Sequence, residues 1–154
     1  MIDCIPSNLN FLDPIVITGH TSSVRYALFL NDVTIISASD DKTVRFWDLK
    51  TKDEIEKLEF GSIPNSIELS KDGEILSICS GNTVTFYNTK TMNKIKEHQV
   101  PTQVHSSTMH PDKSVFVCGG EDFKMYKYDY VEGTEIGKKS LSYSINQYFI
   151  FFNL

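Results

Sequence analysis

The sequence has few cysteines, no long apolar run and no basic stretch. Its three cysteines, Cys4, Cys79 and Cys118, are odd in number and widely spaced, which argues against a disulfide framework and against a zinc site. No apolar run approaches the roughly 20 residues of a membrane-spanning helix. The first basic residue is Arg25, so we expect no secretory signal. With 15 Lys and Arg against 20 Asp and Glu, the net charge is −5, which disfavours direct binding to a phosphate backbone.

A unit of about 40 residues recurs three times. Trp47 aligns with Tyr87 and Tyr128 at offsets of 40 and 41 residues, and each is followed by Asp or Asn. Further upstream, residues 35–37 align with 75–77, and residues 115–118 take that place in the third copy. Each copy holds about four short runs rich in β-branched and aromatic residues, separated by polar turns. This pattern predicts four antiparallel strands per copy, which is the spacing of a propeller blade.

The expected strands can be placed by residue number. An isolated outer strand over residues 15–18 comes first. The first blade then uses 24–30, 34–38, 43–48 and 55–60, and the second uses 66–70, 75–79, 83–87 and 94–100. The third uses 104–109, 115–118, 124–129 and a last strand within 135–145. No segment shows the long 3.6-residue period of a helix, so the fold class is all-β.

The first copy resembles a WD repeat. Between the pair Gly19-His20 and the pair Trp47-Asp48 lie 26 residues, and residues 37–48 read Ser-Ala-Ser-Asp-Asp-Lys-Thr-Val-Arg-Phe-Trp-Asp. The resemblance implies a buried chain of hydrogen bonds that stabilises the blade. It would run from Trp47 to Ser37, with Ser39 as the less favoured serine, and onward to His20 and Asp41. We interpret these residues as a structural network and not as a hydrolase triad.

The other two copies depart from this pattern. In the second copy the residues aligned with His20, Asp41 and Trp47 are Phe60, Gly81 and Tyr87. In the third copy Asp122 and Tyr128 are kept, Cys118 replaces the serine, and no histidine is in register. Only the first copy can hold the full network, so packing of apolar and aromatic side chains must stabilise the other two.

The resemblance implies a β-propeller fragment of three four-stranded blades plus one orphan outer strand, with an unclosed ring. The expected division is an N-terminal extension at 1–14, blades at 15–60, 61–100 and 101–136, and an atypical apolar tail at 137–154. Residues 148–154 form an uncharged apolar run with β propensity. Two interpretations stay open: a truncated or mis-spliced product, or a short form whose tail pairs with an open edge.

No nucleotide-binding, nucleophile-elbow or metalloprotease motif occurs, so we expect no catalytic, cofactor-binding or metal-binding residue and no enzyme. The prediction is a scaffold for protein–protein interaction. An RNA-binding surface is the weaker alternative. It would use residues 123–128, where lysines alternate with aromatic residues, but alternation in a strand places the two kinds on opposite faces.

Residues 39–48, 72–76 and 119–130 also resemble one particular member of the WD-repeat family. That resemblance implies protein partners: subunits of the survival-motor-neuron complex, which assembles spliceosomal ribonucleoproteins; the RNA-binding protein Unr; and the transforming-growth-factor-β receptor with an inhibitory Smad. It implies the cytoplasm as location, with the nucleus second. Another WD-repeat adaptor, such as a propeller subunit of translation initiation factor three, and a non-functional truncated product are the alternatives.

Overall fold

The protein is all-β. The computed structural model describes residues 16–140, which form twelve strands in three four-stranded antiparallel sheets and contain no helix. The first sheet holds β1 (Val24–Asn31), β2 (Thr34–Ser39), β3 (Thr43–Asp48) and β4 (Glu54–Glu59). The second holds β5 (Pro64–Leu69), β6 (Ile75–Ser80), β7 (Thr83–Asn88) and β8 (Lys94–Gln99). The third holds β9 (Val104–Met109), β10 (Val115–Gly120), β11 (Lys124–Asp129) and β12 (Glu135–Ser140).

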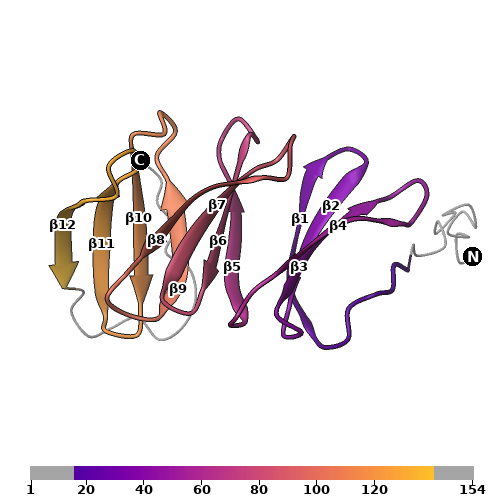
Figure 1. Ribbon diagram of the computed structural model, residues 1–154, viewed down its shortest axis with the longest axis horizontal. Coiled ribbons are helices and arrows are strands. Elements are labelled where there is room, and N and C mark those ends of the chain that lie inside the picture. Colours follow the sequence, from indigo (N-terminus) through magenta and orange to yellow (C-terminus); the bar gives the residue numbers. More distant parts are fainter. Residues whose placement is uncertain (1–15, 141–154) are drawn as a thin grey trace, which may run out of the picture.

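The three sheets stand side by side in chain order and do not close into a ring (Figure 1). Within each sheet the strands also follow chain order, so each sheet is a simple meander. The first strand of the second and third sheets contacts the sheet before it. This arrangement confirms the predicted open propeller fragment of three blades.

Each sheet has two distinct faces because successive side chains of a strand point in opposite directions. The sheets stand in a row in chain order. We call the face of a sheet on the N-terminal side of this row its leading face, and the face on the C-terminal side its trailing face. In the first sheet Ile35 pairs with Trp47 on the leading face, whereas Ile36 pairs with Phe46 on the trailing face. The trailing face of one sheet packs against the leading face of the next.

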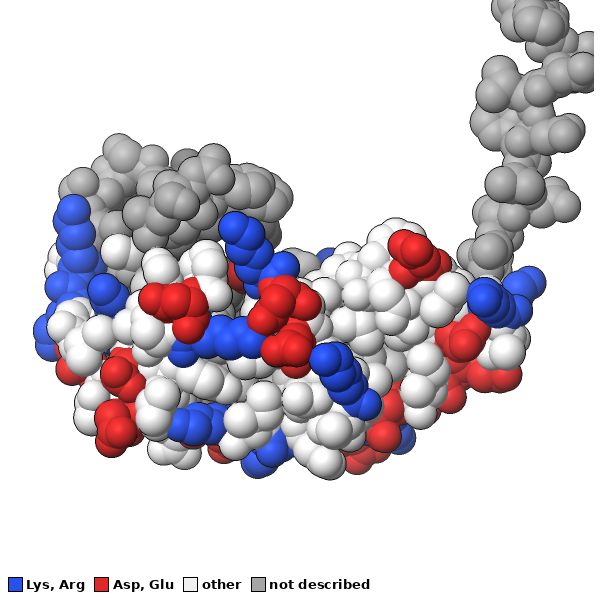
Figure 2. Space-filling model, turned by 90° about the horizontal axis from the view of Figure 1, so that it is seen from above, with Lys and Arg blue, Asp and Glu red and all other residues white. Residues whose placement is uncertain are grey.

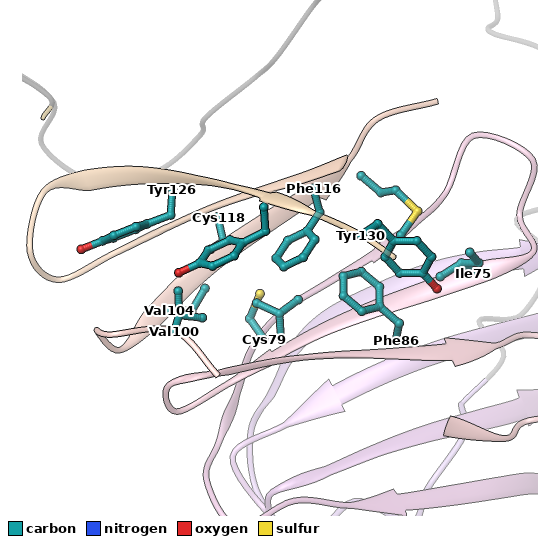
Figure 3. Packing of buried hydrophobic residues seen from close by; sticks show 12 residues of the cluster. Ile75, Cys79, Phe86, Val100, Val104, Phe116, Cys118, Tyr126 and Tyr130 are labelled. Atoms are coloured by element: carbon teal, nitrogen blue, oxygen red, sulfur yellow. The ribbon is translucent and has the colours of Figure 1, made fainter. Parts of the chain in front are cut away.

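Two apolar cores fill the spaces between the sheets. The first joins Ile36, Ala38, Val44 and Phe46 to Ile67, Leu76 and Ile78. The second lies between the second and third sheets and is rich in rings (Figure 3). There the ring of Phe86 lies 5.1 Å from Phe116 and 5.0 Å from Tyr130, both edge to face. Each fully buried side chain of this size contributes about 1.5–3 kcal/mol.

Two cysteines lie in the second core. Cys79 and Cys118 are buried thiols, and the Cys79 thiol donates a hydrogen bond to Ser107 Oγ at 3.1 Å. Burial raises the pKa of Cys79 to about 11 and the pKa of Cys118 to about 12. Both groups therefore stay protonated at neutral pH. Cys4 lies outside the described residues.

The turn between β6 and β7 is shorter than its counterpart in the first sheet. Ser80 pairs directly with Thr83, whereas in the first sheet the last pair before the turn is Ala38 with Val44. This shortening shifts β6 by one residue relative to the sequence alignment. The position of Ser37 is consequently occupied by Ile78, and the alignment of residues 35–37 with 75–77 is wrong by one residue.

The predicted orphan strand is not formed in the described residues. Residues 16–20 adopt no regular secondary structure, because a strand needs a neighbour for its backbone hydrogen bonds and the described residues offer none there. At the other end β12 runs to Ser140, so residues 137–140 belong to the third sheet. The extension at 1–14, and the tail from 141 onward including residues 148–154, lie outside the described residues.

Candidate partner-binding surface

The structure brings the four residues of the expected network together in the first sheet. The indole Nε1 of Trp47 donates a hydrogen bond to Ser37 Oγ at 2.7 Å. The same oxygen lies 2.7 Å from His20 Nε2, and His20 Nδ1 lies 2.9 Å from Asp41 Oδ2. The chain of contacts therefore runs from Trp47 through Ser37 and His20 to Asp41.

The order of these contacts fits one tautomer of the His20 imidazole. Because the Trp47 indole can only donate, Ser37 Oγ accepts that bond and directs its own hydrogen to His20 Nε2. The proton on the imidazole then lies on Nδ1, where it is donated to Asp41. With this tautomer each polar side-chain atom in the chain of contacts has a partner, as buried polar groups require.

The Asp41 carboxylate is held in its charged form. Burial alone would raise its pKa, but hydrogen bonds from the Thr43 hydroxyl, the Thr21 amide and His20 outweigh burial and lower the pKa well below its usual range. The Thr43 hydroxyl donates to Oδ1 at 2.6 Å and the Thr21 amide to Oδ2 at 3.0 Å. The carboxylate is also only 3.6 Å from Nη2 of Arg45.

Two further observations show how closely the network is packed. Ser39 lies outside it, because its hydroxyl accepts the Asp41 amide hydrogen at 3.1 Å and donates to the carbonyl oxygen of Ser22. The backbone at Gly19 lies directly against the indole, since a Cβ there would be 2.6 Å from Trp47 Cη2. A side chain at this position would displace the tryptophan.

Ser37, His20 and Asp41 have the hydrogen-bond order of a hydrolase triad, but the serine is inaccessible. Ser37 is 5% exposed, and its oxygen already accepts the hydrogen bond from the indole of Trp47, itself 5% exposed. The side chains of His20 and Asp41 are only 7% and 6% exposed. No substrate carbonyl can reach Ser37 Oγ without removing Trp47.

The second and third sheets use other contacts at the equivalent places. In the second sheet the rings of Phe60 and Tyr87 lie 6.3 Å apart, edge to face, where the first sheet has His20 and Trp47. In the third sheet the hydroxyl of Tyr126 donates to Asp122 at 2.6 Å. This hydrogen bond raises the pKa of Tyr126 to about 12. Sequence comparison retained Asp122 but did not identify Tyr126 as its partner.

A hollow of about 440 Å³ opens beside β1 and β5, the first strands of the first and second sheets. Its lining consists of Arg25 of β1, Asn65 of β5 and residues of turns and connections, namely Lys42, Gly61, Ser62, Ile63, Gly81 and Gln103. One of these residues also joins two sheets, because the Asn65 side-chain amide donates to the carbonyl oxygen of Val104 at 2.8 Å. The sequence did not point to this hollow, because its lining comes from turns and strand ends that no single motif connects.

The charge of the hollow differs from that of the whole chain. Its lining includes two cations, Arg25 and Lys42, and no carboxylate. Arg25 forms an ion pair with Asp40 just outside the lining, and Lys42 is exposed on the turn between β2 and β3. Elsewhere charges of both signs alternate over the visible face (Figure 2). The hollow therefore suits acidic or hydrogen-bonding groups of a ligand.

Within residues 16–140 no cluster of His, Cys, Asp and Glu side chains could hold a metal ion. Across the same range there is also no helix with the length and apolar character needed to cross a membrane.

Comparisons with known proteins agree with this architecture. Residues 14–48 match the family model of the WD domain, G-beta repeat. The chain is 42% identical over 124 residues to serine-threonine kinase receptor-associated protein of Gallus gallus, and 35% identical over 127 residues to the protein of that name from Dictyostelium discoideum. These alignments cover 80% of this chain but only 35% and 43% of those proteins.

A solved structure of U3-55K matches with a TM-score of 0.73 at 13% identity. That alignment covers 82% of this chain and 42% of the other, and it shows the fold alone. The chain thus spans less than half the length of the relatives it matches. The described residues form three blades of a WD-repeat propeller, and the chain is a WD-repeat protein that resembles part of serine-threonine kinase receptor-associated protein.

Proposed function

We propose that this chain is part of a non-enzymatic scaffold that binds protein partners through the hollow beside β1 and β5. The observation that carries the proposal is the contrast between two sites. The Ser37, His20 and Asp41 contacts are sealed beneath Trp47, whereas the hollow is open and lined by residues of the first two sheets and of the connections between sheets. The proposed role of the sealed residues is structural, and partner recognition belongs to the open surface.

The proposed partners follow from the similarity to serine-threonine kinase receptor-associated protein. The name of that relative points to a receptor serine-threonine kinase. We propose the transforming-growth-factor-β receptor with an inhibitory Smad, Unr, and the survival-motor-neuron complex in spliceosomal ribonucleoprotein assembly as the partners to test. The proposed location is the cytoplasm, with the nucleus second. The division into units at 15–60, 61–100 and 101–136 is proposed with them.

A pull-down tests the proposal. The immobilised chain is incubated with purified survival-motor-neuron subunits, Unr, the receptor kinase domain and the inhibitory Smad, and retention is measured by immunoblot. A full-length relative serves as positive control. Lys42→Glu reverses a charge in the hollow, and Lys50→Glu makes the same change at an exposed lysine outside it.

The expected result is retention of at least one partner by the wild-type chain and by Lys50→Glu, and loss of retention with Lys42→Glu. Retention by the full-length relative but not by this chain would overturn the assignment for this chain. Equal retention of a partner by both variants would show that the hollow is not the binding surface.

A further inference from the structure

The alternating run in β11 places its aromatic and basic residues on opposite faces. Tyr126 and Tyr128 lie on the leading face and are buried in the second core. Lys127 lies on the trailing face and is exposed, with half-buried Met125 two residues away. The third sheet is the last of the described residues, and no described strand covers this trailing face.

Internal comparison shows that this face differs from its two equivalents. The residue that pairs with Ile36 in the first sheet is Phe46, and the residue that pairs with Ser77 in the second is Phe86. Both phenylalanines are fully buried against the next sheet. In the third sheet the residue that pairs with Val117 is Lys127. A buried aromatic position has become an exposed cation.

A second position changes in the same way. Leu58 pairs with Val44 in the first sheet, and His98 pairs with Val84 in the second. In the third sheet Lys139 pairs with Met125. Because Lys127 pairs with Gly137, Lys139 is its diagonal neighbour on the same face, at a Cα separation of about 7–8 Å.

These two lysines are not balanced by carboxylates of the described residues. The neighbouring Lys124 forms an ion pair with Asp122 and Lys138 forms one with Glu135, but among the described residues neither Lys127 nor Lys139 does so. Basic side chains gather at the end of the molecule formed by the third sheet (Figure 2). Half-buried apolar side chains flank the lysines, because Val117 of β10 pairs with Lys127 and Met125 of β11 pairs with Lys139.

We propose that the trailing face of the third sheet binds an extended acidic segment of a partner protein. On the side facing the sheet, this segment carries two carboxylates two residues apart, flanked by apolar residues. Residues i and i+2 of a strand lie about 6.6 Å apart on one face, which matches the diagonal of Lys127 and Lys139. The carboxylates pair with the lysines while the apolar side chains cover Val117 and Met125.

A second copy of this chain fits less well. Phe86 packs against Phe116 and Tyr130, and the equivalent positions on the leading face of the first sheet are Ile35 and Leu49. Docking of that face would bury Lys127 against apolar side chains without a carboxylate, which is unfavourable. Residues 141–154 contain no Asp or Glu and therefore offer no side-chain carboxylate to the lysines.

Single-stranded RNA also fits less well. Binding of unpaired bases relies on aromatic side chains on which the bases stack. Tyr126 and Tyr128 belong to the second core, where Figure 3 shows Tyr126, whereas Lys127 lies on the opposite face of β11. The chain as a whole carries a charge of −5. An acidic polypeptide therefore matches this face better than a polyphosphate does.

The test measures binding of a fluorescent peptide, Val-Thr-Glu-Thr-Glu-Thr-Val, to the full chain by fluorescence anisotropy. The same peptide with lysine in place of both glutamates is the charge control. The double variant Lys127→Glu/Lys139→Glu reverses both charges on the trailing face of the third sheet. The double variant Lys50→Glu/Lys71→Glu makes the same charge change at exposed lysines elsewhere. A 12-nucleotide oligouridylate is the third probe, and circular-dichroism melting checks that each variant folds.

We expect the acidic peptide to bind the wild-type chain and the Lys50/Lys71 variant, and to bind the Lys127/Lys139 variant roughly tenfold or more weakly, because two attractive contacts become repulsive. The lysine peptide should not bind. Weakening by Lys42→Glu with no effect of the Lys127/Lys139 change would place the peptide in the hollow and overturn the proposal. Equal weakening by both double variants, no binding of the acidic peptide, or an oligouridylate that binds in its place and depends on Lys127 and Lys139 would overturn the proposal.

Discussion

Ser37 Oγ lies 2.7 Å from both Trp47 Nε1 and His20 Nε2, so one hydroxyl forms hydrogen bonds with two buried rings. The indole donates to it and the imidazole accepts from it. No other hydroxyl of the first sheet makes both contacts, since Ser39 is bonded to the turn. The orientation of the leading-face tryptophan thus depends on this serine.

Replacing this hydroxyl should destabilise the protein. In Ser37→Ala the indole N–H of Trp47 and the Nε2 atom of His20 lose their partner while both stay buried, at a cost of about 1–3 kcal/mol. The free energy of unfolding is measured from urea denaturation followed by tryptophan fluorescence. Ser23→Ala, at an exposed serine just before β1, should change it by less than about 0.5 kcal/mol. Equal effects of the two variants would contradict a structural role for the network.

The Asp41 carboxylate should make stability depend on pH in the acid range. Its pKa is lowered in the folded protein, so its stabilising effect is complete above the unfolded pKa of about 4 and is lost as the pH falls toward the folded pKa. Asp41→Asn should therefore be less stable than the wild type at pH 7, and the difference should shrink below about pH 4. Thermal unfolding between pH 2.5 and pH 7 checks this. A difference that stays constant over the whole range would show that ionised Asp41 does not stabilise the fold.

The turn after β3 contains a position where glycine should be favoured. Lys52, Met92 and Gly133 lie four residues after the last residue of β3, β7 and β11, and their φ angles are 66°, 58° and 71°. Each amide bonds back to the residue four before it, at 2.8–3.0 Å. A residue with a side chain pays about 1–2 kcal/mol for this left-handed conformation, and glycine avoids that cost while losing about 0.5–1 kcal/mol in chain entropy.

Lys52→Gly should therefore raise the free energy of unfolding by about 0.5–1 kcal/mol. Lys50→Gly in the same turn has no left-handed φ to relieve and should lower it. Urea denaturation of the two variants provides the comparison. A loss of stability in Lys52→Gly would mean that the lysine side chain stabilises the turn through contacts stronger than the backbone strain.

Much of the fold could be predicted because strand signals repeat within the chain. Positions in register with Trp47 gave the third strand of each sheet, and alternation in residues 124–129 correctly separated buried tyrosines from exposed Lys127. The sequence could not reveal the one-residue shortening before Thr83, because loss of a turn residue leaves strand composition unchanged. Because of that shortening, Ile78 occupies the position in the second sheet that Ser37 occupies in the first.

The binding surfaces were harder to predict than the strands. The bond between Tyr126 and Asp122 depends on side-chain direction within one sheet, and the hollow gathers residues as far apart as Arg25 and Gln103. Neither follows from local pattern or spacing. The orphan strand failed for a similar reason, since strand propensity in residues 15–18 does not supply a pairing neighbour.

The two interior thiols provide a chemical probe of one junction in the molecule. Cys79 and Cys118 both belong to the core between the second and third sheets, and within residues 16–140 no cysteine belongs to the core between the first and second. A thiol-specific reagent can modify either one only while those two blades are apart. Alkylation rates mapped to these residues would therefore measure how often the second and third blades separate, independently of any opening between the first two.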